Sequence, residues 1–364
     1  MNGPTVGVEE EFLLLDPRTG ENVPAAPSVA GKLPEELRGQ SRREFRHSMV
    51  EMVTPVCGSL GEVAESLRRM RQAAAEAAAA AGASLVALGA TPVGEPRLLV
   101  TDDPRYEAIA GHYGPIVGDP AVCGCHVHVG VPDRETAIEV CNHLRPWLPV
   151  VQAMTVNSPF FGGVDTGHAS WRAMQLDRWP SLGPTPYFAS AADLDRTVRL
   201  LVDAGVMLDE TLVLWHARPS LRYPTVEVRV ADVCPSVADT VLLTALVRAL
   251  VGTALDDIRA GRRALPVPDP VLKAAHWNAA HSGLSGKLLD PSRERARPAW
   301  ELVDELFRTV TPALDRHGDL DTAYDLLACL RTVGTGTDRL RRELERTGDL
   351  PATLADAARR TVTG

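Results

Sequence analysis

The chain has 364 residues, of which 45% are hydrophobic and 23% are charged, and its formal net charge is −9. This length and composition are typical of a globular protein with a sizeable core. The acidic balance excludes a surface built mainly to neutralise nucleic-acid phosphates. We expect no nucleic-acid or membrane partner and a cytoplasmic location, because we find no basic-then-apolar leader and no apolar run of about 20 residues.

The first predicted element is a strand over Thr5–Leu15, which contains three consecutive glutamates. Side chains alternate between the two faces of a strand, so Glu9 and Glu11 point one way and Glu10 points the other. Two carboxylates on one face, about 7 Å apart, repel each other unless a cation lies nearby. An edge strand that shows its charges to water is the alternative, and the apolar residues that follow Glu11 count against it.

The segment 42–55 adds two more acids, Glu44 and Glu51. They are seven residues apart, which corresponds to two helical turns, so a helix here would carry both on one face. A solvated helix face is the alternative interpretation. The alanine-rich stretch 62–81 then predicts a helix with Ser59 as its N-cap, and a strand follows over 84–88.

The strand predicted over Val122–Val131 has two chemically different faces. One face carries cysteines and valines, and the other carries Gly124, His126, His128 and Gly130. Imidazoles flanked by glycine leave room for a ligand, and histidine is a common metal ligand. The Cys-x-Cys-His-x-His string is also typical of zinc sites, although alternation places the cysteines and histidines on opposite faces. Two structural histidines remain another interpretation.

The strand predicted over Thr225–Val230 places Glu227 and Arg229 on one face and three valines on the other. Such a pair is either a surface ion pair or a metal ligand beside a cation that holds a phosphoryl group. Taken together, the strands and the segment 42–55 supply five acids, His126 and an arginine. Carboxylate-rich sites with few histidines suit magnesium or manganese better than zinc.

The remaining predicted helices are unevenly mixed with the strands, and they cover 134–148, 194–204, 237–258, 299–317, 322–332 and 338–346. This order favours an α+β fold with a mostly antiparallel sheet over a regular alternation of strands and helices. We expect one catalytic domain over 1–364. Its C-terminal part, from about 270, is expected to be largely helical and to follow a loop at 265–270.

Several stretches in chain order together resemble one family, the bacterial type 2 glutamate–cysteine ligases and especially their carboxylate–amine ligase branch. The matching stretches are Gly7–Phe12, Met49–Pro55, Cys123–Gly130, Asn157–Phe160, Asp165–Gly167, Arg218–Ser220 and Tyr223–Asp232. Two departures bear on the substrate. The chain has Trp215-His216-Ala217 where the branch usually has Trp-Asp before its Arg-Pro-Ser stretch, and Phe161 and His168 stand where other aromatic residues are expected.

The resemblance implies a fold like the catalytic half of glutamine synthetase, with the active site on one face of the sheet and helices on the other. It also implies ATP with Mg²⁺, or Mn²⁺, as cofactors. The implied metal ligands form two sets, Glu11, Glu44 and Glu51 in one, and Glu9, His126 and Glu227 in the other. The implied catalytic residues are Arg229, which contacts the transferring phosphate, and Glu51, and Asn157 is a substrate-binding candidate.

The expected reaction joins a small carboxylate to an amine, by resemblance glutamate to cysteine, through an acyl phosphate formed from ATP. Arg172 and Arg218 are candidate clamps for a substrate carboxylate, because a guanidinium can bind one through two parallel hydrogen bonds. The alternatives are an ATP-dependent phosphotransferase, a zinc hydrolase that uses His126 and His128, and a non-catalytic binding protein. A homo-oligomer is left open.

Overall fold

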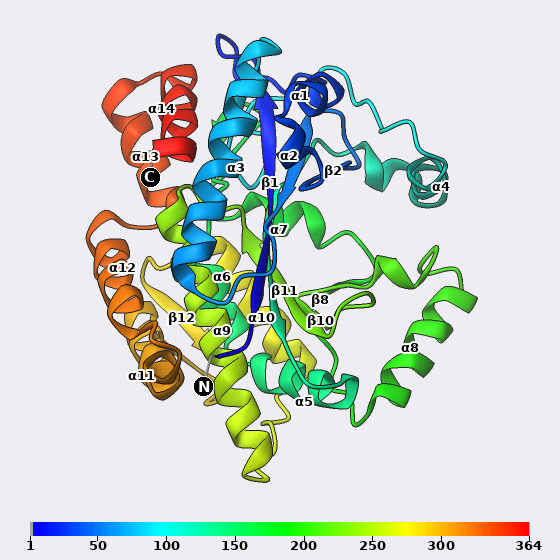
Figure 1. Cartoon of the computed structure of the whole chain (residues 1–364), viewed down its shortest axis with the longest axis vertical. Coiled ribbons are helices and arrows are strands. Elements are labelled where there is room, and N and C mark those ends of the chain that lie inside the picture. Colours follow the sequence, from blue (N-terminus) through cyan, green and yellow to red (C-terminus); the bar gives the residue numbers. More distant parts are fainter. Residues whose placement is uncertain (1–2, 364) are drawn as a thin grey trace.

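The computed structural model describes residues 3–363 and is built around one antiparallel sheet of seven strands (Figure 1). The strand order is β10-β11-β5-β1-β3-β2, and β4 pairs with the far end of β1. This confirms the predicted α+β fold, and all four predicted strands belong to this sheet. The strands are β1 (Val6–Leu15), β2 (Ser41–Arg42), β3 (Met49–Val53), β4 (Ser84–Val86), β5 (Gly124–Gly130), β10 (Ala217–Pro219) and β11 (Thr225–Asp232).

The register of the sheet gathers the polar residues on one face. Glu9 lies opposite His126 on β5, and Glu11 lies opposite Glu51 on β3. On the other side of β5, Glu227 of β11 lies opposite His128. Directly opposed residues of neighbouring strands point to the same face, so the four strands β1, β3, β5 and β11 present their acids and histidines together.

Helices α3 (Leu60–Ala80) and α9 (Val237–Arg259) cover the opposite face of the sheet. The start of α3 is a capping box, because the Ser59 hydroxyl accepts the Glu62 N–H at 3.2 Å and the Glu62 carboxylate accepts the Ser59 N–H at 3.3 Å. This face of β1 includes one charged side chain, Glu10, which is fully buried against Arg71 of α3. The three consecutive glutamates therefore alternate between the polar face and the core, as predicted.

Helix α9 corrects the expectation that no apolar run approaches membrane-spanning length. It has 23 residues, and a window within it has a mean hydropathy of 1.6, which by length and composition is enough to cross a membrane. However, 83% of that window is buried inside the protein, where α9 packs on β1, β5, α3 and α11. A helix that is apolar on all sides is expected at the centre of a large core.

The other helices surround this centre, and six of them were not predicted as separate helices: α1, α2, α4, α7, α10 and α14. The predicted helix 134–148 is two helices, since Pro146 and Pro149 remove backbone donors between and within them. The helices are α1 (Ala26–Lys32), α2 (Glu35–Arg38), α4 (Pro104–Tyr113), α5 (Arg134–Leu144), α6 (Leu148–Met154), α7 (Trp171–Leu176), α8 (Ala191–Asp203), α10 (Asp269–Ser282), α11 (Ala299–His317), α12 (Leu320–Val333), α13 (Gly336–Thr347) and α14 (Leu350–Thr363), with 3₁₀ turns η1 (Gly114–Gly118) and η2 (Glu210–Leu212).

Three short pairings complete the described structure. They are β6 (Phe160–Phe161) with β7 (Val164–Asp165), β8 (Leu182–Gly183) with β9 (Leu214–Trp215), and β12 (Lys287–Asp290) with β13 (Arg295–Pro298). The region after 268 contains helices α10 to α14 and the β12–β13 hairpin, and it follows an irregular segment at 262–268. That the chain is one catalytic domain stays a prediction.

The segment 42–55 is not helical, which corrects the predicted arrangement of its acids. Glu51 lies on strand β3, and Glu44 lies in the loop between β2 and β3. Met49, Val50 and Met52 are buried and Val53 ends the strand, so pairing with β1 decides the conformation. The loop nevertheless returns Glu44 to the side of Glu51.

Candidate active site

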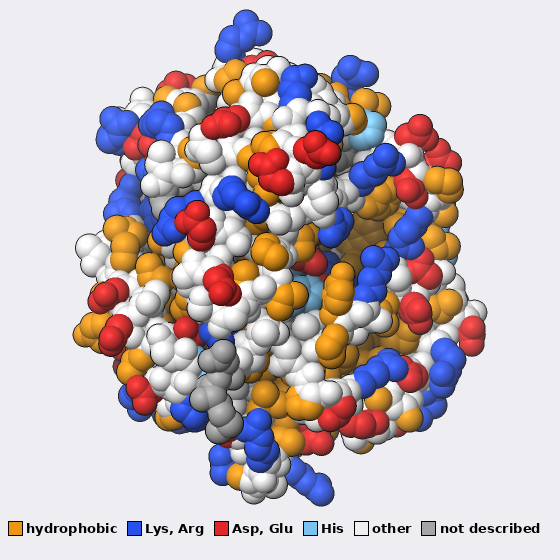
Figure 2. Space-filling model, viewed as in Figure 1, with side chains coloured by type: hydrophobic (Ala, Val, Ile, Leu, Met, Phe, Trp, Pro, Cys, Tyr) orange, Lys and Arg blue, Asp and Glu red, His pale blue; other side chains and the backbone are white. Residues whose placement is uncertain are grey.

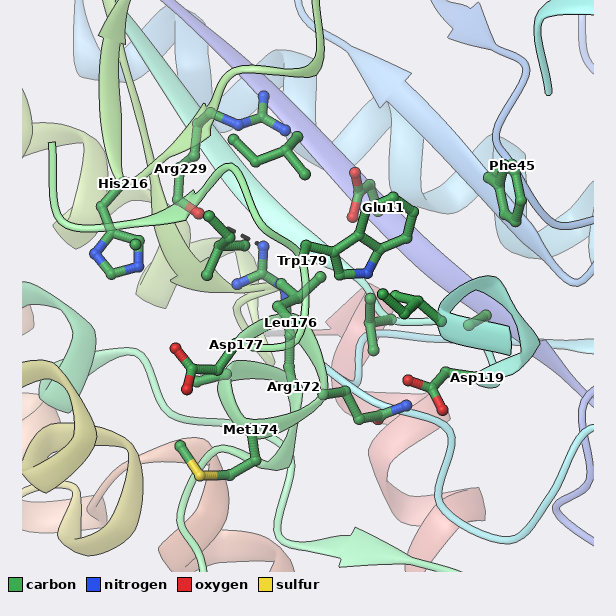
Figure 3. Close-up of a pocket in the computed structure, with 18 of the residues that line it drawn as sticks. Glu11, Phe45, Asp119, Arg172, Met174, Leu176, Asp177, Trp179, His216 and Arg229 are labelled. Atoms are coloured by element: carbon green, nitrogen blue, oxygen red, sulfur yellow. Dashed lines mark hydrogen bonds between the residues drawn. The ribbon is translucent and has the colours of Figure 1, made fainter. Parts of the chain in front are cut away.

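Two cavities meet the polar face of the sheet. The first cavity has a volume of about 400 Å³ and is lined at one end by Glu11, Glu44, His126, Arg172 and Arg229. Its outer wall is apolar, with Phe45, Tyr106, Ile109, Leu176 and Trp179 among the lining residues. Figure 2 shows a hollow with apolar side chains around it and an acidic and a histidine side chain inside, and Figure 3 shows the residues of the first cavity. The second cavity, of about 890 Å³, contacts Glu9 and His128.

Glu11, Glu44 and Glu51 form the first acid set, in which one oxygen of each lies within 4.8 Å of the others. Glu11 and Glu51 come from opposed positions of β1 and β3, and Glu11 Oε2 accepts the Gly124 N–H at 2.5 Å. Burial, followed by the charge of Glu11, raises the pKa of Glu44 to about 8. Burial, followed by the charges of Glu44 and the other acids, raises the pKa of Glu51 well above its ordinary value. Without a cation, Glu44 and Glu51 therefore hold their protons more tightly than a free glutamate does, because the surroundings do not supply enough positive charge for all three acids to ionise.

The second set lies around Glu9, between β5 and β11. His126 Nδ1 lies 3.3 Å from Glu9 Oε2 and 4.0 Å from Glu227 Oε1, so the three predicted ligands are close together. Burial alone would raise the pKa of Glu9, but hydrogen bonding and charge from His126 and His128 hold it below its usual range. Burial likewise opposes ionisation of Glu227, yet Arg229 and Arg218 keep its pKa low.

His128 belongs to the second set but was not among the predicted ligands. One atom each from Glu9, His128 and Glu227 lies within 4.8 Å of the others. The His128 Nδ1 is 3.0 Å from the Thr225 hydroxyl, whereas its buried Nε2 has no hydrogen-bond partner and lies 3.3 Å from Glu9 Oε1. A ligating nitrogen is commonly oriented in this way through the other ring nitrogen. The position of His128 two residues from His126, on the same face, was the signal available in the sequence.

The donor atoms of both sets fit a hard divalent cation. They are mostly carboxylate oxygens with one or two imidazoles, which suits Mg²⁺ or Mn²⁺. Such a cation would give the unpartnered Nε2 of His128 a bonding partner, and it would relieve the repulsion among the crowded acids. Cys123 and Cys125 are buried on the opposite face, so the described structure has no mixed cysteine–histidine zinc set at this strand.

Arg172 and Arg229 reach the first cavity from α7 and β11. Arg229 contacts Glu227 Oε1 and lies 3.4 Å from His126 Nδ1. Arg172 is 7% exposed, its Nη2 donates to the Arg229 carbonyl at 3.5 Å (dashed in Figure 3), and its buried Nε has no partner. A Cβ at Gly124 would overlap this guanidinium, which explains a glycine in that strand. Arg172 Nη1 also lies 3.8 Å from Oδ1 of the buried Asp232, so its partnerless Nε is the group left to bind a ligand in the cavity.

Two predicted substrate-binding residues lie elsewhere. The Arg218 guanidinium donates from Nε to Glu227 Oε2 at 2.8 Å and from Nη1 to the carbonyls of Thr211 and Val213, so it supports Glu227 rather than clamping a substrate. Asn157 is 1% exposed and its amide donates to the carbonyls of Ala87 and Val233, each at 2.9 Å. Neither residue lines the first or second cavity, so the described structure gives no support to either assignment, and both stay predictions.

The raised pKa values predict how stability depends on pH without divalent cations. Because the folded pKa of Glu44 is raised from 4.5 to about 8, the folded state binds the proton more tightly than the unfolded state. Stability is therefore expected to fall as pH rises from about 4.5 to about 8. Thermal melts in a chelator should show this loss, and Mg²⁺ should reverse it at pH 8.

The variant Glu51→Gln removes one of the three repelling charges and provides a control for the same measurement. It should melt higher than the wild type at pH 8 in chelator and should gain less from added Mg²⁺. A wild-type melting temperature that is insensitive to pH and to Mg²⁺ over this range would contradict the crowded-acid interpretation.

Sequence comparisons identify relatives along almost the whole chain. A sequence model described as glutamate–cysteine ligase family 2 matches residues 5–356. A protein of Salinispora tropica, provisionally named glutamate–cysteine ligase 2, is 62% identical over 358 residues, which cover 98% of this chain and 95% of that protein. A protein of Nocardia farcinica, provisionally named glutamate–cysteine ligase 2-1, is 46% identical over 367 residues, covering 100% of this chain and 95% of that one.

Solved structures share the fold at low sequence identity. A glutamate–cysteine ligase of Francisella tularensis, crystallised with AMP, superposes with a TM-score of 0.65 at 14% identity and covers 100% of this chain and 89% of that one. A bifunctional glutathione synthetase of Pasteurella multocida superposes with a TM-score of 0.69 at 13% identity over 99% of this chain, which spans only 52% of that protein. With the match over 5–356 and relatives above 60% identity, the chain belongs to glutamate–cysteine ligase family 2 and is an ATP-dependent ligase of that type.

Proposed function

We propose that the chain forms an amide bond between a small carboxylic acid and an amine through an acyl phosphate, with glutamate and cysteine as the first candidates. The observation that supports this most directly is the arrangement of two acid sets and Arg229 on one sheet face between two cavities. Glutamate and cysteine are suggested by the names of the relatives. Phosphoryl transfer depends on positioning and charge neutralisation more than on a protein nucleophile, and this site offers both.

The nucleotide is assigned to the second cavity and the acid and amine to the first. The second cavity is the larger of the two, and it reaches the metal-ligand candidates Glu9 and His128. The first cavity contains Arg172 and Arg229, whose guanidinium groups can hold anionic groups of a substrate. Phosphates lying between the two sets would then be within reach of both cavities.

Divalent cations are assigned to both sets, with Glu11, Glu44 and Glu51 in one, and Glu9, His126, His128 and Glu227 in the other. Bound there, such cations would neutralise the phosphate oxygens and stabilise the charge that develops during phosphoryl transfer. The protein's own side chains would position the reactants and exclude water. Arg229 orients the transferring group, Arg218 keeps Glu227 in place, and the apolar wall of the first cavity excludes water.

The test measures ADP release across a panel of amino acids and amines, with mass spectrometry of the products. For the acid that supports turnover, hydroxylamine added without an amine should trap the acyl group as a hydroxamate. A stable phosphorylated product with no hydroxamate would instead identify a phosphotransferase. Turnover without nucleotide would favour a hydrolase, and full activity after extensive chelation would exclude the assigned role of the acids.

A further inference from the structure

His216 lies inside the first cavity, next to the arginine assigned to the transferring phosphate. It stands between β9 and β10, and its carbonyl accepts the Arg229 N–H at 2.8 Å. The following residue, Ala217, lies opposite Val228, so His216 lies opposite Arg229 in the sheet. Opposed residues point to the same face, and both side chains line the first cavity (Figure 3).

A chain of two hydrogen bonds sets which nitrogen of His216 carries the proton. His276 of α10 places its Nδ1 2.6 Å from Oε1 of Gln152 on α6, and its Nε2 3.2 Å from Nδ1 of His216. With the Gln152 amide oriented so that its oxygen faces His276, that oxygen only accepts, so the proton of His276 is on Nδ1 and its Nε2 is an acceptor. The Nδ1 of His216 must then be the donor, which leaves a lone pair on His216 Nε2.

Both rings are neutral over the physiological pH range. Burial, followed by the charge of Arg172, lowers the pKa of His216 to about 3. Burial and the neighbouring His216 hold the pKa of His276 well below its ordinary value. Within residues 3–363 no group hydrogen-bonds His216 Nε2, and this nitrogen is not fully buried. The cavity therefore contains an uncharged hydrogen-bond acceptor, and Arg172 lines the same cavity near enough for its charge to lower the pKa of this ring.

We infer that His216 positions the incoming amine, with its Nε2 accepting an N–H of an amine whose own carboxylate is bound by Arg172. This rests on the proposed function and specifies how its second substrate is recognised. In the bond-forming step the amine nitrogen attacks the acyl carbon and the carbon–oxygen bond to phosphate breaks. The electron pair and the amine proton leave with the phosphate, so His216 orients the nitrogen and gains no proton.

The expected second substrate combines an amine with a carboxylate, as an amino acid does. A neutral acceptor selects a nitrogen with a hydrogen to donate, and Arg172 selects the anionic end. His216 stands between Trp215 and Ala217, directly opposite Arg229 in the sheet, and its side chain lines the first cavity. His216 would therefore help to determine which amine this chain accepts.

The decisive experiment lets an amine and hydroxylamine compete for the same acyl phosphate. The substrates are glutamate and cysteine, or whichever acid and amine support ADP release in the panel. The measured quantity is the ratio of amide to hydroxamate formed. The variant His216→Phe keeps a ring but loses the acceptor, so this ratio should fall about tenfold, the effect of one uncharged hydrogen bond. His216→Gln supplies an acceptor at similar reach and should recover most of the ratio.

The matched control is His281→Phe, which changes an exposed histidine on the same helix as His276 but outside the cavity. It should keep the wild-type ratio. An unchanged ratio in His216→Phe overturns the inference. If the wild type forms neither amide nor hydroxamate, the proposed function fails instead, so the two failures are distinguishable.

A second measurement does not depend on activity or on any variant folding well. Long-range proton–nitrogen NMR correlations of the wild-type protein, labelled with ¹⁵N in histidine, report the tautomer of each ring. His216 and His276 should both be neutral with the proton on Nδ1 at pH 7. An Nε2–H tautomer, or a protonated ring, at His216 would remove the acceptor and overturn the inference.

Discussion

Replacing Arg229 by lysine is expected to lower the turnover number by about a hundred- to thousandfold, the usual cost of losing one preorganised group that stabilises developing charge. Arg229 lies in the first cavity, contacts Glu227 and is 3.4 Å from His126 Nδ1. Lysine keeps the positive charge beside Glu227, so the fold should persist. It loses the planar fork that can contact two phosphate oxygens together.

The effect of Arg229→Lys should appear in the turnover number and much less in the KM for ATP. The reason is that charge spreads over the equatorial oxygens as the phosphoryl group detaches, so the contact strengthens in the transition state. Steady-state kinetics with varied ATP separate the two parameters. Arg222→Lys, at an exposed residue in the turn before β11, is the control and should match the wild type. Weakened ATP binding with near-normal turnover would make Arg229 a ground-state binding residue.

The largest expected effect on stability is at the buried pair of Glu10 and Arg71. Arg71 donates to both Glu10 oxygens, at 2.9 and 2.5 Å, and also to the carbonyls of Thr361 and Cys234. Each side chain is only 1% exposed. Removing one partner leaves a buried charge unpaired, so Arg71→Met should cost about 3–5 kcal/mol of unfolding free energy. Urea denaturation followed by circular dichroism measures this loss.

The double variant Glu10→Leu, Arg71→Met tests whether the loss comes from the unpaired charge. Replacing both partners by apolar groups leaves no buried ion, so this variant should be clearly more stable than Arg71→Met alone. If the double variant instead loses more unfolding free energy than Arg71→Met, the pair stabilises the fold by packing and through the hydrogen bond from Arg71 to the Thr361 carbonyl of α14. Because Glu10 points away from Glu9 and Glu11, these two substitutions should leave the polar face of the sheet unchanged in the folded double variant.

The sequence by itself determined which side chains share a face. Alternation along β1, β5 and β11 placed Glu9 with Glu11, His126 with His128, and Glu227 with Arg229, because a period of two residues is a local property of a strand. The serine cap of α3 was equally local, since the capping box involves residues three apart. The ordered motifs also pointed to the family that the comparisons identified.

Only the tertiary structure decided how those faces meet and what each polar group contacts. The register of β11 on β5 brings Glu227 to His128, and the loop between β2 and β3 returns Glu44 to Glu51. Arg218 was predicted to clamp a substrate, whereas the pairing of β10 with β11 places its guanidinium where it donates a hydrogen bond to Glu227. The contact of His216 with His276 joins residues 60 apart. Strand register and helix packing depend on the whole core, so no local pattern could reveal these contacts.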